Sequence, residues 1–136
     1  MKETKHSLCY NGDIWTLENY KTVRELFPTV KKFMLGRPLM ANPELVQELV
    51  AYEKCLAEGR EWSGYTVSME KLKQFHDRLL DGYMQQMNGD GNNVLFKMKE
   101  LWGFLGRLFP NREKLVKKLV KANRIEEYEY LAEQIF

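Results

Sequence analysis

The segment 93–110, NVLFKMKELWGFLGRLFP, constrains the fold of this chain more than any other segment. Its apolar residues recur at steps of three and four, which is the spacing of a helix that buries one face. They are Val94, Met98, Leu101, Trp102, Leu105, Leu108 and Phe109. Phe96 and Phe104 fall outside this stripe, so the pattern predicts packing partners on more than one side of the helix. We expect this helix to be the packing axis of a helical core.

The chain from Ser68 onward has the pattern of helices throughout, which predicts an antiparallel bundle of about four helices. Ser68 is suited to cap a long helix, and the sequence NGDGN at 88–92 ends that helix. Asn111 is expected to cap a further helix, and residues 124–136 carry the last one. His76 lies on the apolar stripe of the first of these helices, which favours a packed structural histidine over a catalytic one.

The first sixty residues alternate strands and helices. Residues 6–10 and 30–35 are short apolar runs beside turn sequences, which is typical of strands. Thr16 is suited to cap a helix between them, and Asn42-Pro43-Glu44 has the cap, proline and acid of a second helix start. This order predicts a parallel β-α-β-α unit. Residues 59–67 follow as a loop that we interpret as a domain boundary. The expected fold class is therefore mainly α.

Composition excludes several classes of protein. The sequence contains no run of about 18 uncharged apolar residues, so no membrane-spanning helix is predicted. The first ten residues, MKETKHSLCY, have no apolar core of the kind that a secretory signal needs. Cys9 and Cys55 lack metal-ligand spacing, and we expect both to be small buried side chains. A reduced, cytoplasmic location fits this cysteine usage, and no metal site is predicted.

Positive charge is concentrated in one block. Residues 94–124 hold nine Lys and Arg against two acidic residues, a net charge of +7, whereas residues 125–136 carry −4 and residues 1–93 carry −1. A polyanion-binding surface and a solvated lysine face both account for such a block. An anionic membrane surface is less favoured, because the opposite face of the lysine-bearing helix is expected to be in the core.

The lysines of this block are expected to share one surface. Steps of three, one and three place Lys114, Lys117, Lys118 and Lys121 on one stripe of one helix. Phosphate contacts dominate the affinity of proteins for nucleic acids, so this stripe predicts salt-dependent RNA binding. The candidate RNA-binding residues are Lys97, Lys99, Arg107, Arg112, Lys114, Lys117, Lys118, Lys121 and Arg124.

Three short motifs followed by the helical tail resemble a known family. The motifs are Tyr10-Asn11-Gly12-Asp13-Ile14, Met34-Leu35-Gly36-Arg37 and Asn42-Pro43, and the tail segments are FHDRLLDGY and VLFKMKELW. Together they resemble the C-terminal part of bacterial tRNA-dihydrouridine synthases, which are flavin enzymes with a TIM barrel and a helical domain. The resemblance implies that residues 1–58 are the C-terminal end of an incomplete TIM-barrel FMN domain. Residues 68–136 would be the helical tRNA-binding domain.

The resemblance also implies a cofactor site. Its residues, contacting the phosphate and ribityl region of FMN, would be Asn11, Gly12, Asp13, Gly36 and Arg37. In TIM barrels the loops after the last two strands commonly bind phosphate, glycine allows close approach of backbone N–H groups, and an arginine adds charge. Two ordinary turns are the alternative interpretation, because Asn-Gly-Asp is common in turns. Pro38 stands where the family usually has glycine, and it removes an N–H donor.

The reaction that the resemblance implies is reduction of uridine to 5,6-dihydrouridine in tRNA, with NADPH reducing the FMN. The family's catalytic cysteine belongs to an earlier segment, and neither Cys9 nor Cys55 matches its motif. We therefore expect a C-terminal portion that contributes tRNA binding and part of the FMN phosphate site. It would hold no catalytic residue and no flavin, and it would be inactive alone.

Further expectations concern alternative functions, membrane binding and oligomeric state. A non-enzymatic helical protein-interaction module and the tail of another FMN TIM-barrel oxidoreductase are the alternative functions. No membrane partner is expected. Strand edges of the incomplete barrel segment would lack their native neighbours, which predicts a strand-exchanged oligomer.

Overall fold

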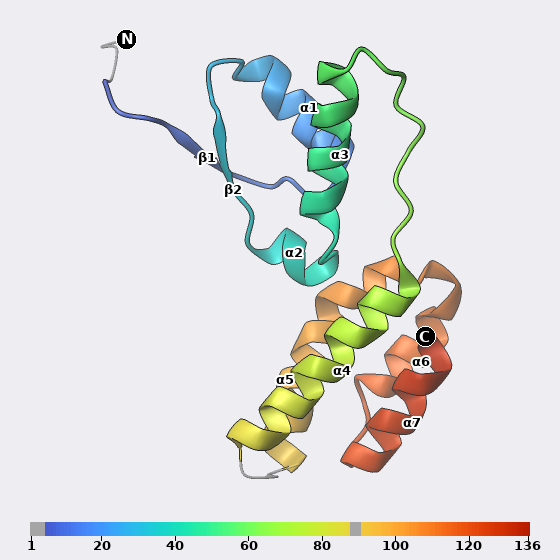
Figure 1. The fold of residues 1–136 in the computed structure, drawn as a ribbon. Coiled ribbons are helices and arrows are strands. Elements are labelled where there is room, and N and C mark those ends of the chain that lie inside the picture. Colours follow the sequence, from blue (N-terminus) through green and yellow to red (C-terminus); the bar gives the residue numbers. More distant parts are fainter. Residues whose placement is uncertain (1–4, 88–90) are drawn as a thin grey trace. The chain divides into compact units, whose positions relative to one another are not determined.

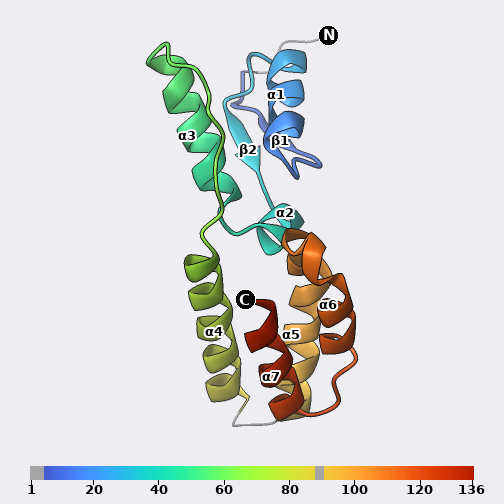
Figure 2. The same cartoon turned by 90° about the vertical axis from the view of Figure 1, so that its right-hand side faces the viewer.

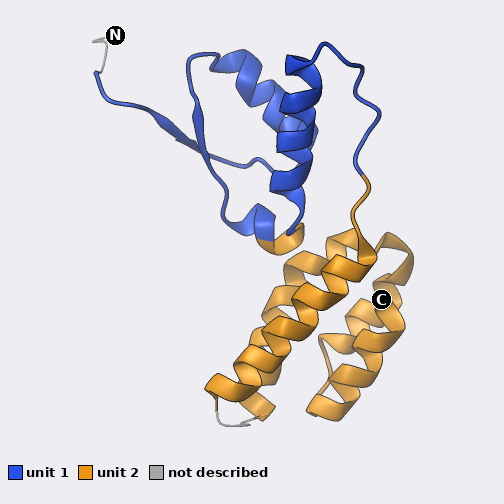
Figure 3. Cartoon of the chain, viewed as in Figure 1, with its two compact units in different colours: residues 1–39, 43–65 blue, residues 40–42, 66–136 orange. Residues whose placement is uncertain are grey.

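The computed structural model describes residues 5–87 and 91–136 (Figure 1). The chain divides into two compact units, which are coloured separately in Figure 3. Unit 1 comprises residues 1–39 and 43–65, and unit 2 comprises residues 40–42 and 66–136. In the described residues the chain is mainly helical, with seven α-helices and one sheet of two parallel strands. The predicted mainly-α class is confirmed.

Unit 1 contains the only strands in the described residues. Strand β1 (Cys9–Asn11) is followed by helix α1 (Leu17–Leu26) and strand β2 (Lys32–Met34). The two strands pair in parallel, with Cys9 opposite Lys32 and Asn11 opposite Met34. A parallel pair needs a crossover connection, and α1 supplies it. The predicted parallel β-α-β order is confirmed, although each strand is shorter than the apolar run that predicted it.

Helix α1 begins as its sequence predicts. The side chain of Thr16 caps it, because Oγ1 accepts a hydrogen bond of 3.2 Å from the backbone N–H of Asn19. Its buried residues pack with Ile14 and with helix α3 (Leu45–Ala57). The buried core of unit 1 consists of Ile14, Leu17, Tyr20, Val23, Leu45 and Leu49.

The second helix start of unit 1 differs from the prediction. Helix α2 (Arg37–Ala41) precedes α3 and contributes residues to both units. Because α2 ends immediately before Asn42, residues 42–44 form the turn between two helices. Glu44 is the N-cap of α3 and makes no side-chain capping hydrogen bond. The predicted cap at Asn42 is therefore wrong, since proline and asparagine suit a tight turn as well as a helix start.

Unit 2 is built from helices. They are α4 (Met69–Gln86), α5 (Gly91–Leu105), the 3₁₀ turns η1 (Gly106–Leu108) and η2 (Pro110–Arg112), α6 (Glu113–Leu119) and α7 (Ile125–Ile135). Helix α5 packs against α4 and α7, and α6 packs against α7 (Figure 2). The hydroxyl of Ser68 caps α4 by accepting from the N–H of Lys71, as predicted.

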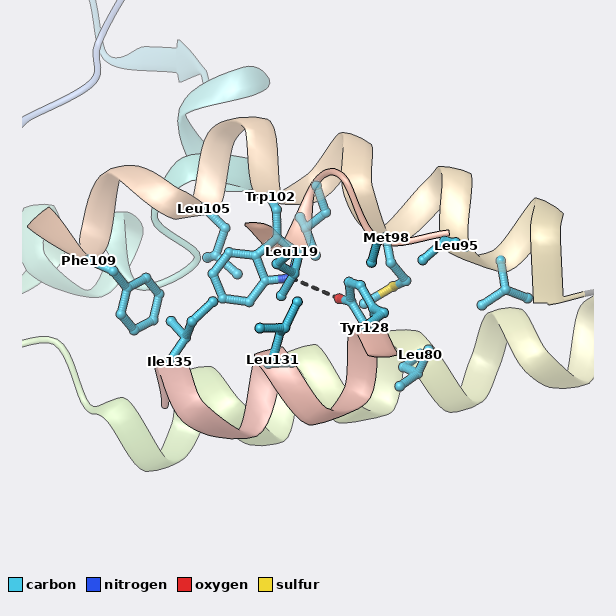
Figure 4. Close-up of a cluster of buried hydrophobic side chains, with 14 of the residues drawn as sticks. Leu80, Leu95, Met98, Trp102, Leu105, Phe109, Leu119, Tyr128, Leu131 and Ile135 are labelled. Atoms are coloured by element: carbon cyan, nitrogen blue, oxygen red, sulfur yellow. Dashed lines mark hydrogen bonds between the residues drawn. The ribbon is translucent and has the colours of Figure 1, made fainter. Parts of the chain in front are cut away.

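The core of unit 2 forms around the segment 93–110 (Figure 4). The predicted apolar stripe is buried except at Leu108, which is partly buried. Helix α5 has packing partners on more than one side, as predicted, although Phe96 itself is 68 % exposed and Phe104 is only partly buried. Helix α5 ends at Leu105, and a Cβ on Gly106 would lie 2.8 Å from Cγ1 of Val116. This glycine therefore allows the chain leaving α5 to lie close to α6.

Two helix boundaries in unit 2 also differ from the prediction. Gly91 and Asn92, predicted as part of a break, belong to α5, and residues 88–90 of that break lie outside the described residues. Asn111 lies within η2, and Arg112 is the N-cap of α6 without a side-chain capping bond. The predicted cap at Asn111 is wrong because Pro110 begins a 3₁₀ turn there.

Candidate functional site

The first candidate site lies at the carboxyl edge of the two strands. Because the strands are parallel, the loop that leaves β1 at Asn11 and the loop that leaves β2 at Met34 emerge at the same edge. A guanidinium–carboxylate contact joins these loops, with 3.3 Å between Nη2 of Arg37 and Oδ1 of Asp13. The structure thus brings together two predicted site residues that are 24 positions apart in the sequence.

The electrostatics of this edge are mixed. The side chains of Arg37 and Asp13 are 67 % and 71 % exposed, and the guanidinium of Arg37 also lies 5.8 Å from the ring centroid of Trp15. An exposed ion pair of this kind contributes about 0–1 kcal/mol, so an incoming phosphate can displace the carboxylate. Asp13 itself would repel a phosphate but can accept a hydrogen bond from a hydroxyl group.

The two glycines of this edge have different roles. A Cβ on Gly12 would overlap the ring of Tyr10, which packs against Phe27 and Phe33, so Gly12 is needed for the fold. A Cβ on Gly36 would meet no atom within 4 Å. The fold therefore does not require glycine at position 36, and the space beside it is open to a ligand. Pro38 lies in the first turn of α2, where a missing N–H costs no helical hydrogen bond.

The second candidate site is the basic surface of unit 2. Lys114, Lys117 and Lys118 are exposed on α6, whereas Leu119 of the same helix is fully buried. Lys121 is exposed in the turn after α6, where its N–H bonds to the carbonyl of Lys118. The prediction that Lys121 shares one helix with the other three lysines is wrong, because α6 ends two residues earlier. Lys121 nevertheless adds its charge in the turn directly after the three lysines of α6.

Several predicted RNA-binding cations already have partners. Nζ of Lys99 donates a 2.8 Å hydrogen bond to the carbonyl of Ala122, and this lysine is half-buried. Lys97 lies 3.8 Å from Glu100, and Lys117 lies 3.9 Å from Glu113. Among the described residues no ion pair engages five exposed cations. They are Arg112, Lys114, Lys118, Lys121 and Arg124. Arg107 is exposed in η1.

A buried polar network occupies the core between α4, α5 and α7. Nε2 of His76 lies 2.6 Å from the hydroxyl of Tyr128, and that hydroxyl accepts a 2.8 Å hydrogen bond from Nε1 of Trp102 (Figure 4 draws the second contact). Nδ1 of His76 lies 2.9 Å from Asp77. The carboxylate of Asp77 can only accept, so Nδ1 of His76 donates to it, and Nε2 of the neutral ring accepts from the hydroxyl of Tyr128. The proton of a neutral His76 is then on Nδ1 and points to Asp77.

The electrostatics of this network favour a neutral imidazole. His76 is 2 % exposed, and burial lowers its pKa below the ordinary value. Burial also raises the pKa of Tyr128 far above its ordinary value. The predicted packing of His76 in the core is confirmed. Periodicity alone does not identify its partners, although two polar-tipped side chains on buried stripes had to find hydrogen bonds somewhere in the core.

The two cysteines differ in burial. Cys55 is buried, as predicted, and its Sγ lies 3.2 Å from the carbonyl oxygens of Arg60 and Glu61. Cys9 is exposed, so its predicted burial is wrong; the short strand β1 leaves it uncovered. Within residues 5–87 and 91–136, no three His, Cys, Asp or Glu side chains gather as metal ligands. No helix in this part of the chain is long and apolar enough to cross a membrane.

Comparison with known proteins gives a partial similarity. Over 44 residues, or 32 % of this chain, the sequence is 39 % identical to tRNA-dihydrouridine(16) synthase of Pseudomonas syringae pv. tomato (strain ATCC BAA-871 / DC3000). The matched region covers 14 % of that protein, so the chain matches only a small part of its length. No family model and no solved structure matches this chain. The similarity supports the resemblance to this family over about a third of the chain.

Proposed function

We propose that this chain supplies the tRNA-binding region and part of the FMN phosphate site of a flavin-dependent tRNA-dihydrouridine synthase. Unit 1 would be the end of the TIM barrel, and unit 2 would be the helical bundle that binds tRNA. The observation that carries this proposal is the run of exposed cations along α6 and the following turn, considered together with the partial similarity to a tRNA-modifying enzyme.

The basic surface has the properties that backbone binding requires. Six cations and one acid occur between positions 112 and 124, and the apolar residues of α6 face the core. The five cations without ion-pair partners can contact phosphates at no cost in intramolecular interactions. Lys117 would give up only a long contact to Glu113, whereas Lys99 would have to leave a carbonyl group. We therefore rank Lys99 as the weakest of the predicted RNA-binding residues.

The strand edge fits the phosphate and ribityl parts of FMN. Arg37 would pair with the phosphate, and the open backbone beside Gly36 would allow its close approach. Asp13 would accept hydrogen bonds from ribityl hydroxyls, a role that suits a carboxylate better than phosphate contact does, and the amide of Asn11 would accept from or donate to them. When bound, FMN supplies the hydride chemistry that converts uridine to dihydrouridine. The residues of this chain would hold the cofactor and the RNA.

A salt series tests the RNA-binding role. Dissociation constants for tRNA are measured at several salt concentrations for the wild type and for the variant Lys117→Glu with Lys118→Glu. Each lost phosphate contact reduces the slope of log K against log salt by about 0.9, so we expect a reduction of about 2 and markedly weaker binding. Lys31→Glu with Lys32→Glu is the matched control, because it makes the same charge change on exposed lysines of unit 1. Wild-type affinity that does not depend on salt would refute the proposal.

A second candidate function is a protein-interaction module, which the exposed apolar face of unit 1 favours. Val46 and Val50 of α3 are 41 % and 62 % exposed, and they line a groove of about 610 Å³ with Phe33 and Leu35. In the proposed parent enzyme other β/α units would cover this groove. In the isolated chain a second copy would do so, and the strand-exchanged oligomer stays a prediction. Titration with tRNA and with an acidic protein in parallel separates the two functions.

A further inference from the structure

One side of α4 carries two cations that lie outside the basic surface described above. Lys71 and Arg78 are exposed, and no ion pair engages either side chain among the described residues. They are seven residues apart, which is nearly two helical turns and about 10 Å along the axis. Gln74 is exposed between them. These three side chains therefore form one polar row on the helix.

Two apolar side chains lie beside this row. Phe75 and Leu79 are partly buried and pack against the core of unit 2, so the fold holds them in place. On the helix they lie between the polar row and the fully buried row that includes Leu72. The five residues of the two rows line a hollow of about 490 Å³. The hollow thus has an apolar floor with a cation at each end.

An apolar floor between two cations matches the chemistry of unpaired nucleotides. Single-stranded nucleic acids bind where bases stack on aromatic side chains while cations follow the backbone. A double helix offers phosphates but keeps its base faces stacked inside, so it would use the cations and leave the floor uncovered. An acidic peptide would likewise use only the charges. The combination of charge and floor therefore favours a single-stranded RNA segment.

We propose that the α4 stripe, defined as Lys71, Gln74, Phe75, Arg78 and Leu79, binds an unpaired segment of RNA. A nucleobase packs over Phe75 and Leu79, and the flanking phosphates contact Lys71 and Arg78. This inference rests on the proposed RNA-binding function and extends it. The RNA partner has a single-stranded region, and its contact with the protein includes a second helix of unit 2.

Binding of two RNA probes tests the assignment. The full chain is titrated with a labelled 15-nucleotide oligouridine and with a 20-base-pair RNA duplex across a salt series. Lys71→Gln with Arg78→Gln removes two phosphate contacts, and at about 0.7 per contact the salt slope for oligouridine falls by about 1.4. Lys31→Gln with Lys32→Gln, on exposed lysines of unit 1, removes the same charge and leaves the slope unchanged. Phe75→Leu keeps an apolar side chain but removes the ring, and oligouridine affinity falls about fivefold or more.

The outcomes separate this inference from the proposed function. Wild-type slope and affinity in the Lys71→Gln, Arg78→Gln variant overturn the inference, as does an effect of Phe75→Leu that is equal for duplex and oligouridine. Circular dichroism of each variant confirms that the helices are retained. If Lys117→Glu with Lys118→Glu leaves RNA binding intact while the α4 variants weaken it, the α6 surface fails and the α4 stripe stands. A wild-type chain that binds neither probe overturns both.

Discussion

Removal of the Tyr128 hydroxyl should destabilise unit 2 strongly, although it deletes a single atom. In Tyr128→Phe the Nε1–H of Trp102 and Nε2 of His76 both lose the partner that now lies 2.8 and 2.6 Å away. Both groups are in residues that are at most 2 % exposed, so water does not replace the hydroxyl. Each buried group that loses its hydrogen bond costs about 1–3 kcal/mol. For the two groups together, the expected loss in the free energy of unfolding is therefore about 2–6 kcal/mol.

Urea unfolding measures this loss directly. With Trp15 and Trp62 of unit 1 replaced by Phe in every variant, Trp102 fluorescence reports the core of unit 2, and the far-ultraviolet circular dichroism signal reports the helices of the whole chain. Tyr130→Phe is the matched control, because Tyr130 lies on the same helix and is 66 % exposed; its effect should stay within about 0.5 kcal/mol. If Tyr128→Phe also changes the unfolding free energy by less than about 0.5 kcal/mol, the hydroxyl is not the hydrogen-bonded centre of the core that its geometry indicates.

Two further predictions concern the same unit. The folded pKa of His76 lies below its unfolded value of about 6.5, so the unfolded state binds more protons and stability falls as the pH drops from about 6.5 toward the folded pKa. Urea midpoints at pH 7.5 and 5.5 should show this fall, and His76→Gln should reduce it; an unchanged pH dependence in the variant would rule out His76 as its source. Gly106→Ala should destabilise the fold by about 1–3 kcal/mol, because its Cβ would lie 2.8 Å from Val116. Gly103→Ala, at an exposed position of α5 where the Cβ meets nothing within 4 Å, should be neutral or stabilising by up to about 1 kcal/mol in thermal melts. Equal effects of the two substitutions would contradict the packing argument.

Features that depend on short stretches of sequence were predictable. Periodicity alone identifies the buried stripe of α5. Thr16 and Ser68 cap their helices because a helix begins at the next residue in each case. Asn42 and Asn111 have equally good capping chemistry but do not cap, since a short helix or a 3₁₀ turn already occupies the neighbouring residues. Local propensity therefore located the helices better than it located their ends.

Features that depend on distant residues were not predictable from the sequence. The close approach of Gly106 to Val116 joins the end of α5 to α6, and periodicity does not encode it. The pairing of Asp13 with Arg37 depends on the parallel register of β1 and β2. The family resemblance places both residues in one site, but nothing in the sequence indicates that the carboxylate of Asp13 pairs with the guanidinium of Arg37. The unequal availability of the cations in unit 2 likewise follows only from their partners in space.

The hydrogen bond from Lys99 to the carbonyl of Ala122 has a consequence for mutational scans of the basic surface. This hydrogen bond links α5 to the turn that carries Lys121 and Arg124, so it helps to fix the positions of these two exposed cations. A Lys99→Ala variant would release that turn, and in the proposed RNA-binding role it would weaken binding by displacing Lys121 and Arg124. A scan that removes only charges would then count Lys99 as an RNA contact. Faster hydrogen exchange of residues 120–124 in the variant would instead identify Lys99 as a residue that holds this turn in place.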